Sequence, residues 1–455
     1  RRRVYESGDK GESWTEALGT LSRVWGKKKD GEAKNVGSGF ITATLGGVET
    51  EKRNVMLVTL PVYSTEKQKD KKKGKLHLWL TDNTHIVDIG PVSGKDDDAA
   101  ASALLYKSAG SGDQEKKEDK LIALYEKKKG DDESKPSPGM VSVVLTEELK
   151  RVKEVLSTWK EVDERVSKLC PSSIAAQETS TANACSAVNI TAGLVGFLSG
   201  NFSNGKWRDE YLGVNATVKG GVGTENGVKF TGRGAGAEWP VGRQGENQLY
   251  HFANYNFTIV ATVSIHGEPK EENPIPLIGV KMNDGNKNTV LLGLSYKNGN
   301  KLELLPSDGT TKEHSVAWEP GTTHQVAIVL QNGTQGSVYV DGQRVGGSPS
   351  DLKDKDSKEI SHFYIGGDGS NAEEKVSQEG VSVTVRNVLL YNHPWTSEEI
   401  AGLAKNTITV PKPEGSRTSA GGTLPRAVSE SGVQGAVSQP HSGGPQRMER
   451  EQLKG

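Results

Sequence analysis

The stretch that decides the fold of this chain is Val383-Thr-Val-Arg-Asn-Val-Leu-Leu-Tyr-Asn-His393. In residues 381–385, valine alternates with serine or threonine. Apolar side chains at every second position are typical of a half-buried β-strand, because successive side chains point to opposite faces of a sheet. These residues alone predict a strand in a β-rich protein, and they fit a well-packed edge strand of a β-sandwich equally well.

Other segments also predict short strands. Before residue 146 they include one nearly continuous apolar run and one run of alternating leucines, at Val55–Leu60, Lys75–Leu80, Ile122–Tyr125 and Val141–Leu145. After residue 188 the clearest predicted strands are Phe257–Val263, Gln325–Leu330 and Ser337–Val340. Asp341-Gly342 predicts a type I′ hairpin turn, which needs positive φ at both central residues. Many short strands with such turns indicate propeller blades before the helix described next and a sandwich after it.

One long amphipathic helix is predicted between the two groups of strands. From Thr146 onward, apolar residues recur with helical spacing as far as Leu169. We expect Thr146 to be the N-cap, and Glu147 and Glu148 to favour the positive end of the helix dipole. Such a helix would be about 36 Å long, enough to brace two domains. A shorter helix is predicted from Thr396 to Lys405.

Composition excludes several classes of function. The chain has 455 residues, a formal net charge of −1 and 33% hydrophobic residues. No global charge therefore points to nucleic acid or to membrane lipid as a partner. No apolar run reaches the roughly 18 residues that a membrane span needs. The histidines show no metal-binding spacing, so neither a metal nor a cofactor is predicted. We interpret the start at Arg1-Arg-Arg3 as that of a fragment or a processed form.

Two cysteines and several glycosylation sequons favour an exposed location. Sequons occur at Asn189, Asn201, Asn215, Asn256 and Asn332, more than chance would place in one such stretch. A secreted or surface-exposed chain would join Cys170 to Cys185 in a disulfide. Two free buried thiols are the alternative.

Several motifs resemble those of the trans-sialidase superfamily of trypanosome surface glycoproteins. Residues 383–393 match its strand VTVxNVxLYNR except at the last position, where His393 stands for arginine. Residues 7–14 fit the sialidase Asp box, with Ser7, Asp9, Gly11 and Trp14 at its fixed positions. Other blocks of the family occur in the same order, among them Gly19–Gly26, Leu76–Asn83, Ala192–Ser199, Leu292–Tyr296 and Gly336–Gly342.

This resemblance implies an all-β organisation in defined parts. Residues 1–145 would form part of a sialidase β-propeller, 146–170 the linking helix and 171–188 a linker. Residues 189–410 would form a lectin-like β-sandwich, a jelly roll of the concanavalin or laminin-G kind. Residues 411–455 are rich in Gly, Ser, Pro and Glu, which predicts a disordered tail because little apolar surface can be buried.

The resemblance also identifies positions that catalysis would require. The family's nucleophile is a tyrosine, and the aligned position here is Ala101. An arginine of the triad that grips the substrate carboxylate aligns with Lys73, which cannot form a bidentate fork. A tryptophan of the acceptor site aligns with Lys71. Glu126 keeps the family's arginine-orienting glutamate. These replacements predict a protein that is not an enzyme.

The predicted function is therefore adhesion rather than catalysis. We expect a surface or secreted protein that binds host cell-surface or matrix glycoproteins, and glycans are a further possible class of ligand. The family implies a lipid anchor as the only membrane attachment. An active sialidase or trans-sialidase and a carbohydrate-binding lectin module are the alternatives. Because the valines of the motif strand need burial, the predicted contact residues are the outward-facing Thr384, Arg386 and Asn387. Tyr391 and His393, taken to lie after the strand, are added to them.

Overall fold

A computed structural model places residues 1–410 in one compact unit and Pro411–Gly455 in a second. The structure describes residues 3–25, 37–46, 52–63, 74–109, 118–127, 139–170, 189–232, 234–242, 249–267, 274–283, 289–298, 300–306, 311–316, 318–352, 359–369 and 381–407. The predicted linker and the predicted disordered tail both lie outside these ranges.

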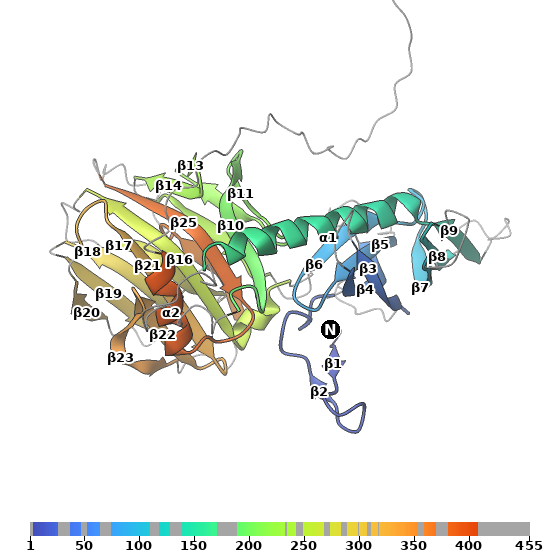
Figure 1. Cartoon of the computed structure of the whole chain (residues 1–455), viewed down its shortest axis with the longest axis horizontal. Coiled ribbons are helices and arrows are strands. Elements are labelled where there is room, and N and C mark those ends of the chain that lie inside the picture. The colour runs from blue at the N-terminus through green and yellow to red at the C-terminus, as the bar shows by residue number, and fades with distance from the viewer. Residues whose placement is uncertain are drawn as a thin grey trace, which may run out of the picture. The chain divides into compact units, whose positions relative to one another are not determined.

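The residues before the long helix form one hairpin and two antiparallel sheets (Figure 1). The hairpin joins β1 (Tyr5–Glu6) to β2 (Thr15–Glu16). The first sheet is four-stranded and contains β3 (Gly39–Gly46), β4 (Lys52–Tyr63), β5 (Gly74–Thr81) and β6 (Ile86–Pro91). The second is three-stranded and contains β7 (Ala99–Lys107), β8 (Lys120–Lys127) and β9 (Met140–Val144). Three of the four strands predicted in this region fall within these elements, and the fourth, Val141–Leu145, extends one residue past the end of β9.

The long helix α1 (Thr146–Ser167) follows β9 directly. Its buried face carries the predicted apolar stripe: Leu149, Val152, Val155, Leu156, Trp159, Val162 and Val166. The N-cap prediction was wrong, because Leu145 occupies that position and makes no side-chain capping bond. Glu147 and Glu148 do lie in the first turn, where the helix dipole favours negative charge.

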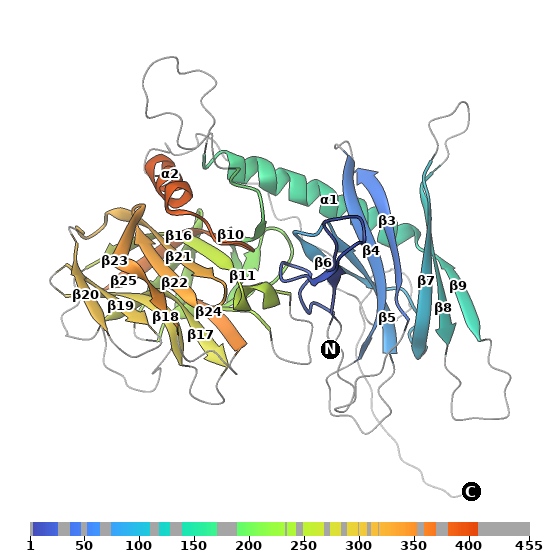
Figure 2. The ribbon, with the colours of Figure 1, turned by 90° about the horizontal axis from the view of Figure 1, so that it is seen from below.

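The remaining strands form one large antiparallel sheet folded into two layers (Figures 1 and 2). Its strands are β10 (Leu194–Ser203), β11 (Lys206–Asp209), β12 (Ala216–Lys219), β13 (Gly221–Thr224), β14 (Gly227–Thr231), β15 (Gly236–Pro240), β16 (Phe257–His266), β17 (Ile275–Asn283), β18 (Val290–Lys297), β19 (Lys301–Pro306), β20 (Lys312–Ser315), β21 (Thr323–Gln331), β22 (Gln335–Val340), β23 (Gln343–Asp351), β24 (Glu359–Ile365) and β25 (Ser382–Tyr391). The 3₁₀ turn η1 (His251–Asn254) and the helix α2 (Ser397–Thr407) complete the domain.

Each layer of this sandwich contributes alternate side chains to one apolar core. One layer runs β20-β19-β18-β17-β24-β15-β12, and β11 and β10 lead from it to the other, β25-β16-β21-β22-β23. Trp207, Trp239, Phe257, Ile328 and Phe363 are among the core residues that are buried between the layers. The fold is thus all-β with two helices, as predicted, and Asp341 and Gly342 both have the positive φ expected for their turn.

A second apolar cluster joins the N-terminal sheets to the sandwich through α1. It includes Leu57, Ala123, Trp159, Phe197 and Tyr391, which come from both sheets, the helix and the outer layer of the sandwich. Because this core is shared, residues 1–410 form a single unit. The proposed division at residues 145, 170 and 188 stays a prediction.

Candidate functional site

The position expected to carry a nucleophile lies on β7, close to the four-stranded sheet. Ala101 faces Gly37, where an added Cβ would lie 3.5 Å from the Ala101 methyl group. The next residue, Ser102, shares a 2.9 Å hydrogen bond with Thr59 and accepts one of 3.2 Å from the Gly39 N–H. The nearby hydroxyls thus hold the two sheets together, and Ala101 itself offers no reactive group.

Of the other positions of catalytic interest, Glu126 lies in the described part of the chain, on β8 opposite the register shift between Ala99 and Ser102 of β7. Lys71 and Lys73 lie outside the described residues. Glu126 is exposed on β8, in register with Met140 of β9. Tyr106, farther along β7, packs against the apolar cluster that surrounds α1. Among the described residues, Tyr106 therefore does not take the place of a nucleophile at Ala101.

The aspartates before β7 serve a structural purpose. Asp97 lies in the turn that precedes this strand and accepts a 2.6 Å hydrogen bond from the Tyr125 hydroxyl. Lys127 forms an ion pair with the same carboxylate. The Lys127 and Tyr125 hydrogen bonds lower the pKa of Asp97. This run of aspartates lies in a turn that Asp97 anchors to β8.

The motif strand β25 is a central strand rather than an edge strand. Its three valines at positions 383, 385 and 388 are buried in the sandwich core, as predicted. Two of the predicted contact residues are also buried, which corrects the sequence prediction. Thr384 is 2% exposed and Tyr391 is 0% exposed. Both faces of this strand are covered, so only Arg386, Asn387 and His393 remain partly exposed.

A β-bulge at Asn387 changes which side chains of β25 face the sandwich core. β16 pairs with β25 along its whole length, whereas the opposite edge of β25 pairs first with β14 and then with β10. Between these two partners Asn387 has φ 48°, and the register with β16 shifts there. The extra residue turns Val388 back into the core and sends Tyr391 to the second cluster. Asparagine tolerates this left-handed conformation better than most residues do.

The residues after the bulge are held by neighbouring segments. The Tyr391 hydroxyl donates a 2.9 Å hydrogen bond to the Ile190 carbonyl, and the Asn392 amide donates one of 2.8 Å to the Thr20 hydroxyl. Burial lowers the pKa of His393, against the opposing charge of Glu399. His393 is therefore neutral at neutral pH, unlike the arginine of the family pattern.

The Asp box forms a compact hydrogen-bonded turn between β1 and β2. Ser13 donates two hydrogen bonds to Asp9, of 2.9 Å from its N–H and 2.6 Å from its hydroxyl. Ser7 donates a third, and the Gly11 N–H donates to the Ser7 hydroxyl. The Ser13 and Ser7 bonds hold the pKa of the Asp9 carboxyl well below its usual range. All four fixed residues take part, since the Trp14 indole N–H bonds to the Gly11 carbonyl.

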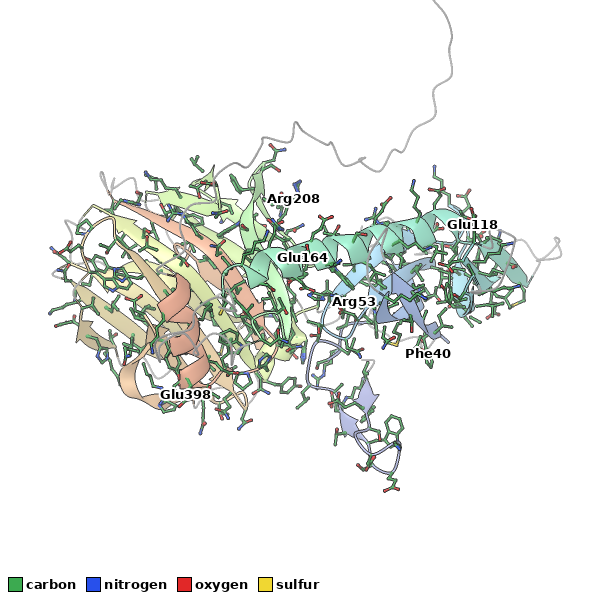
Figure 3. All side chains as sticks on the ribbon, viewed as in Figure 1. Phe40, Arg53, Glu118, Glu164, Arg208 and Glu398 are labelled. Atoms are coloured by element: carbon green, nitrogen blue, oxygen red, sulfur yellow. The ribbon has the colours of Figure 1, made fainter. Side chains whose placement is uncertain are left out.

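A polar cluster between α1, the four-stranded sheet and the sandwich was missed by sequence reasoning. Arg53 forms ion pairs of 2.8 Å with Asp82 and 2.7 Å with Asp163 on α1. The Tyr211 hydroxyl donates a 2.7 Å hydrogen bond to Asp163. His85 stacks on Tyr211 with 4.2 Å between ring centroids. Figure 3 labels Arg53 beside the helix. Only the tertiary fold brings these residues together, so no local pattern could have identified them.

Two carboxylates of this region titrate differently because their partners differ. Although burial opposes it, hydrogen bonds and charge from His85, together with Arg53, lower the pKa of Asp82 to about 2. Asp209 is fully enclosed, and burial raises its pKa to about 6 against three backbone N–H donors, from Phe197, Tyr211 and Gly213. Through these hydrogen bonds Asp209 holds β10 and the segment after β11 together, and it is buried rather than open to solvent.

One cavity of about 330 Å³ lies beside β17, β24 and β25. Its lining includes Tyr364, Asp368 and Ser382 among apolar side chains. Tyr364 lies across two glycines of neighbouring strands, because a Cβ at Gly279 or Gly293 would come within 2.3 Å of its hydroxyl. An aromatic ring with hydroxyl and carboxylate neighbours has groups that can bind a polar ligand.

The described residues include Cys170 and the five sequon asparagines, but not Cys185. Cys170 is disulfide-bonded, whereas Cys185 lies outside the described residues, so their pairing stays a prediction. Four sequon asparagines are exposed, at positions 189, 201, 215 and 332. Asn256 is half-buried, and its side-chain oxygen accepts a 2.8 Å hydrogen bond from the Asn332 N–H. Within the described ranges, no group of three or more His, Cys, Asp or Glu residues is placed so that it could hold a metal ion.

No helix in the described part of the chain is both long and apolar enough to cross a membrane.

Comparison with known proteins identifies the family. Residues 190–398 match the family described as trans-sialidase, C-terminal domain, and residues 1–126 match the BNR repeat-like domain. A sialidase of Trypanosoma cruzi is 33% identical over 408 residues, which cover 89% of this chain and 32% of that protein. Sialidase 85-1.3 of the same organism is 37% identical over 182 residues, 40% of this chain and 99% of its own length.

Solved structures agree with the sequence comparison. The structure of Trypanosoma rangeli sialidase is similar with a TM-score of 0.72 and 37% identity, covering 90% of this chain and 59% of that one. The chain thus spans 59% of the solved sialidase and 32% of the first T. cruzi relative. Its fold is that of a partial sialidase propeller, a linking helix and a β-sandwich. The chain belongs to the trans-sialidase superfamily of trypanosomes.

Proposed function

We propose that this chain is a non-catalytic member of its family and acts as a binding protein. The observation that carries the proposal is Ala101, at the position where the family motif has its nucleophilic tyrosine. A retaining mechanism on sialic acid forms a covalent intermediate, which requires a nucleophile at that position. A methyl group cannot form that bond.

The surroundings of Ala101 support this proposal. The Ser102 hydroxyl is hydrogen-bonded to Thr59 and Gly39, and Tyr106 belongs to a packed apolar cluster. Lys73 replaces an arginine whose planar fork would grip the substrate carboxylate, and a lysine offers only a point charge there. Loss of both functions would leave residual rate from binding alone.

Adhesion is the function that remains for such a scaffold. We propose that the protein is displayed at the cell surface or secreted and that it binds host cell-surface or matrix glycoproteins. Four exposed sequon asparagines support an extracellular location. Arg386 is the most suitable contact residue on β25, because it is partly exposed and lies within 3.4 Å of only one described hydroxyl, that of Ser264.

Enzymatic activity is tested directly with a fluorogenic sialoside. We expect no turnover above a buffer blank, both from this chain and from any longer natural form that contains it. Trypanosoma rangeli sialidase, assayed in parallel, is the positive control. Measurable hydrolysis or sialyl transfer that disappears on heat denaturation would contradict the proposal that the protein is not an enzyme.

Adhesion is tested by binding to immobilised matrix glycoproteins and to host cells. We expect Arg386→Ala to weaken binding several-fold without changing the melting temperature. Arg208→Ala is the matched control, because Arg208 lies on β11 of the same domain and its guanidinium bonds only to Ser203 among the described contacts (Figure 3). Equal binding by both variants and the wild type would remove β25 from the contact surface.

Carbohydrate binding is a second candidate function, favoured by the cavity beside Tyr364. A glycan array distinguishes it from adhesion to protein. Binding to free glycans that is lost in Tyr364→Phe would favour a lectin, because this variant removes only the hydroxyl. Binding to matrix proteins that survives enzymatic removal of their glycans would favour adhesion to protein.

A further inference from the structure

The cavity beside Tyr364 belongs to the sandwich domain. The described residues that line it fall between positions 230 and 383, inside the range 190–398 that matches the C-terminal domain of the family. Its volume is about 330 Å³, at the lower end of the range for small-molecule sites, which is roughly 300–1,000 Å³. Phe230, Ile275 and Leu305 give it apolar walls. The cavity is therefore of a size for a small molecule or for one end of a larger one.

Two of the hydroxyl groups in this cavity form no hydrogen bond with another described residue. They belong to Tyr364 and Ser295, which line the cavity and are both 1% exposed. Strand β18 brings them together, because Gly293 lies against the Tyr364 hydroxyl and Ser295 follows two positions later on the same face of that strand. Buried hydroxyls are normally hydrogen-bonded, so these two indicate a ligand that bonds to them.

A carboxylate oxygen without a partner lies beside the two hydroxyls. Glu303 on β19 is the direct cross-strand neighbour of Ser295 on β18. Its Oε2 atom is buried and accepts no hydrogen bond from the described residues. A carboxylate oxygen can only accept hydrogen bonds, and leaving it buried and unpaired costs free energy. A ligand that reaches Glu303 must therefore donate a hydrogen bond to it.

The lysines on the same face of β17, β18 and β19 are already paired with acids. Lys281 donates a 2.9 Å hydrogen bond to the Asp368 carbonyl and lies 3.6 Å from its carboxylate. Lys297 and Lys301 both form ion pairs with Glu313, of 2.8 and 3.0 Å. Because their charges are neutralised, these lysines attract the acid group of a ligand only weakly, and the unpaired carboxylate on β19 repels it. The charges around the cavity therefore disfavour an anionic ligand.

We propose that this cavity binds a neutral sugar and excludes acidic sugars, an inference that rests on carbohydrate binding as the second candidate function. The hydroxyls of Tyr364 and Ser295 can each donate and accept a hydrogen bond, whereas the Glu303 oxygen only accepts. Sugar hydroxyls also donate and accept, and the C–H groups of a sugar ring pack on apolar walls. An ammonium group would only donate, and an acid group would meet the Glu303 carboxylate. A neutral sugar satisfies all three protein groups.

The test compares neutral sugars with acids of the same shape, by calorimetric titration of the 455-residue chain. The probes are glucose, galactose and mannose, each against its own uronate, in which a carboxylate replaces the hydroxymethyl group. N-acetylneuraminate is a further acidic probe. We expect at least one neutral sugar to bind, and its uronate to bind about tenfold more weakly. Equal or tighter binding of the acids overturns this inference and leaves carbohydrate binding in place, whereas no binding by any probe overturns both.

Two variants test the cavity itself, with circular dichroism and the melting temperature as checks of folding. Ser295→Ala removes one hydroxyl and should weaken binding of the neutral sugar several-fold. Glu303→Gln keeps the size of the side chain but removes its charge, so it should reduce the preference for the neutral sugar over its uronate. Glu225→Gln is the matched control, because Glu225 is exposed between β13 and β14 of the same domain, and it should leave both affinities unchanged. An unchanged affinity in Ser295→Ala, or an unchanged preference in Glu303→Gln, contradicts the assignment of the sugar to this cavity.

Discussion

β25 and β9 have similar sequences and opposite surroundings. Each alternates valine with a small hydroxyl residue, as Val-Thr-Val in residues 383–385 and as Val-Ser-Val in residues 141–143. In β25 the valine and threonine faces are both buried. In β9 the odd-numbered valines are half-buried, whereas Ser142 and its neighbours on the same face are exposed. The pattern therefore indicates a strand in both places and fixes burial in neither.

The difference comes from the number of neighbouring strands. β25 has three hydrogen-bonded partners, β10, β14 and β16, and its outer face is covered near Tyr391 by the cluster that includes α2. β9 has one described partner, and its sheet is held to the rest of the unit by packing against α1 and by the contact of β7 with the four-stranded sheet. A substitution should therefore cost more in β25, and the β7–β9 sheet should depend on the helix.

The largest effect is expected at Trp159, which links the two regions. Its side chain is fully buried, and its indole N–H donates a 2.9 Å hydrogen bond to the Tyr211 carbonyl. Trp159→Ala should lower the free energy of unfolding by about 3–5 kcal/mol. Because the sheet β7–β9 reaches the sandwich through α1, calorimetry should then show two transitions instead of one. A single transition at an unchanged temperature would show that α1 does not couple the regions.

The next test compares the two strands directly. Val385→Ala, in the core, should lower the free energy of unfolding by roughly 1–3 kcal/mol, as large-to-small changes in cores do. Val144→Ala, on the exposed face of β9, should change it by less than about 0.5 kcal/mol. Urea denaturation of both variants supplies the measurement. Equal losses would mean that β9 is covered by something that occupies its exposed face.

The sequence predicted the secondary-structure elements but not the burial of all of their residues. The predicted strands and both helices were found because period-two and helical patterns are local properties. The Asp box could also be read, since its hydrogen bonds join residues no more than four positions apart. Thr384 was taken to face outward because alternation gives the side of a sheet, whereas its burial depends on what covers that side.

Features that depend on distant segments could not be derived in this way. The cluster of Arg53, Asp82, Asp163 and Tyr211 joins residues from three parts of the chain. The bulge at Asn387 exists because β14 and β10 share one edge of β25, which no pattern within the strand reveals. Tyr391 was taken to follow the strand, whereas it is the last residue of β25 and the bulge turns it into the second cluster.

The bulge itself offers a smaller and more specific test. Asn387 has φ 48°, and a β-branched residue is strained there by about 1–2 kcal/mol. Asn387→Val should therefore destabilise the domain by that amount, although valine suits regular strands, while Asn387→Gly should be nearly neutral. Thermal melting distinguishes the pair. If valine were tolerated as well as glycine, the strand would have removed its bulge, and Tyr391 would face the sandwich core instead of the second cluster.

The smallest change in the stability of the whole protein is expected for the Asp box. This turn is exposed, as β9 is, but its polar groups form hydrogen bonds with one another. Asp9→Asn should leave the melting temperature of the protein unchanged, because the hairpin β1–β2 adds little to either large core. Its local effect should still be clear. The Ser13 amide donates to the Asp9 carboxylate, so hydrogen exchange at Ser13 should become faster in the variant.

The pH dependence of the same amide follows from the lowered pKa of Asp9. A carboxyl whose pKa is depressed in the folded state stabilises that state above its ordinary pKa, and it loses this contribution as the pH falls through the depressed value. Protection of the Ser13 amide should thus persist through pH 4, where an ordinary aspartate begins to protonate, and should disappear only in stronger acid. Lys10→Ala is a suitable control for exposure alone, since Lys10 lies in the same turn. Loss of protection already near pH 4 would show that the hydroxyl and amide donors of Ser7 and Ser13 do not stabilise the charged carboxylate of Asp9. The β1–β2 hairpin would then be ordered by its contacts with neighbouring segments.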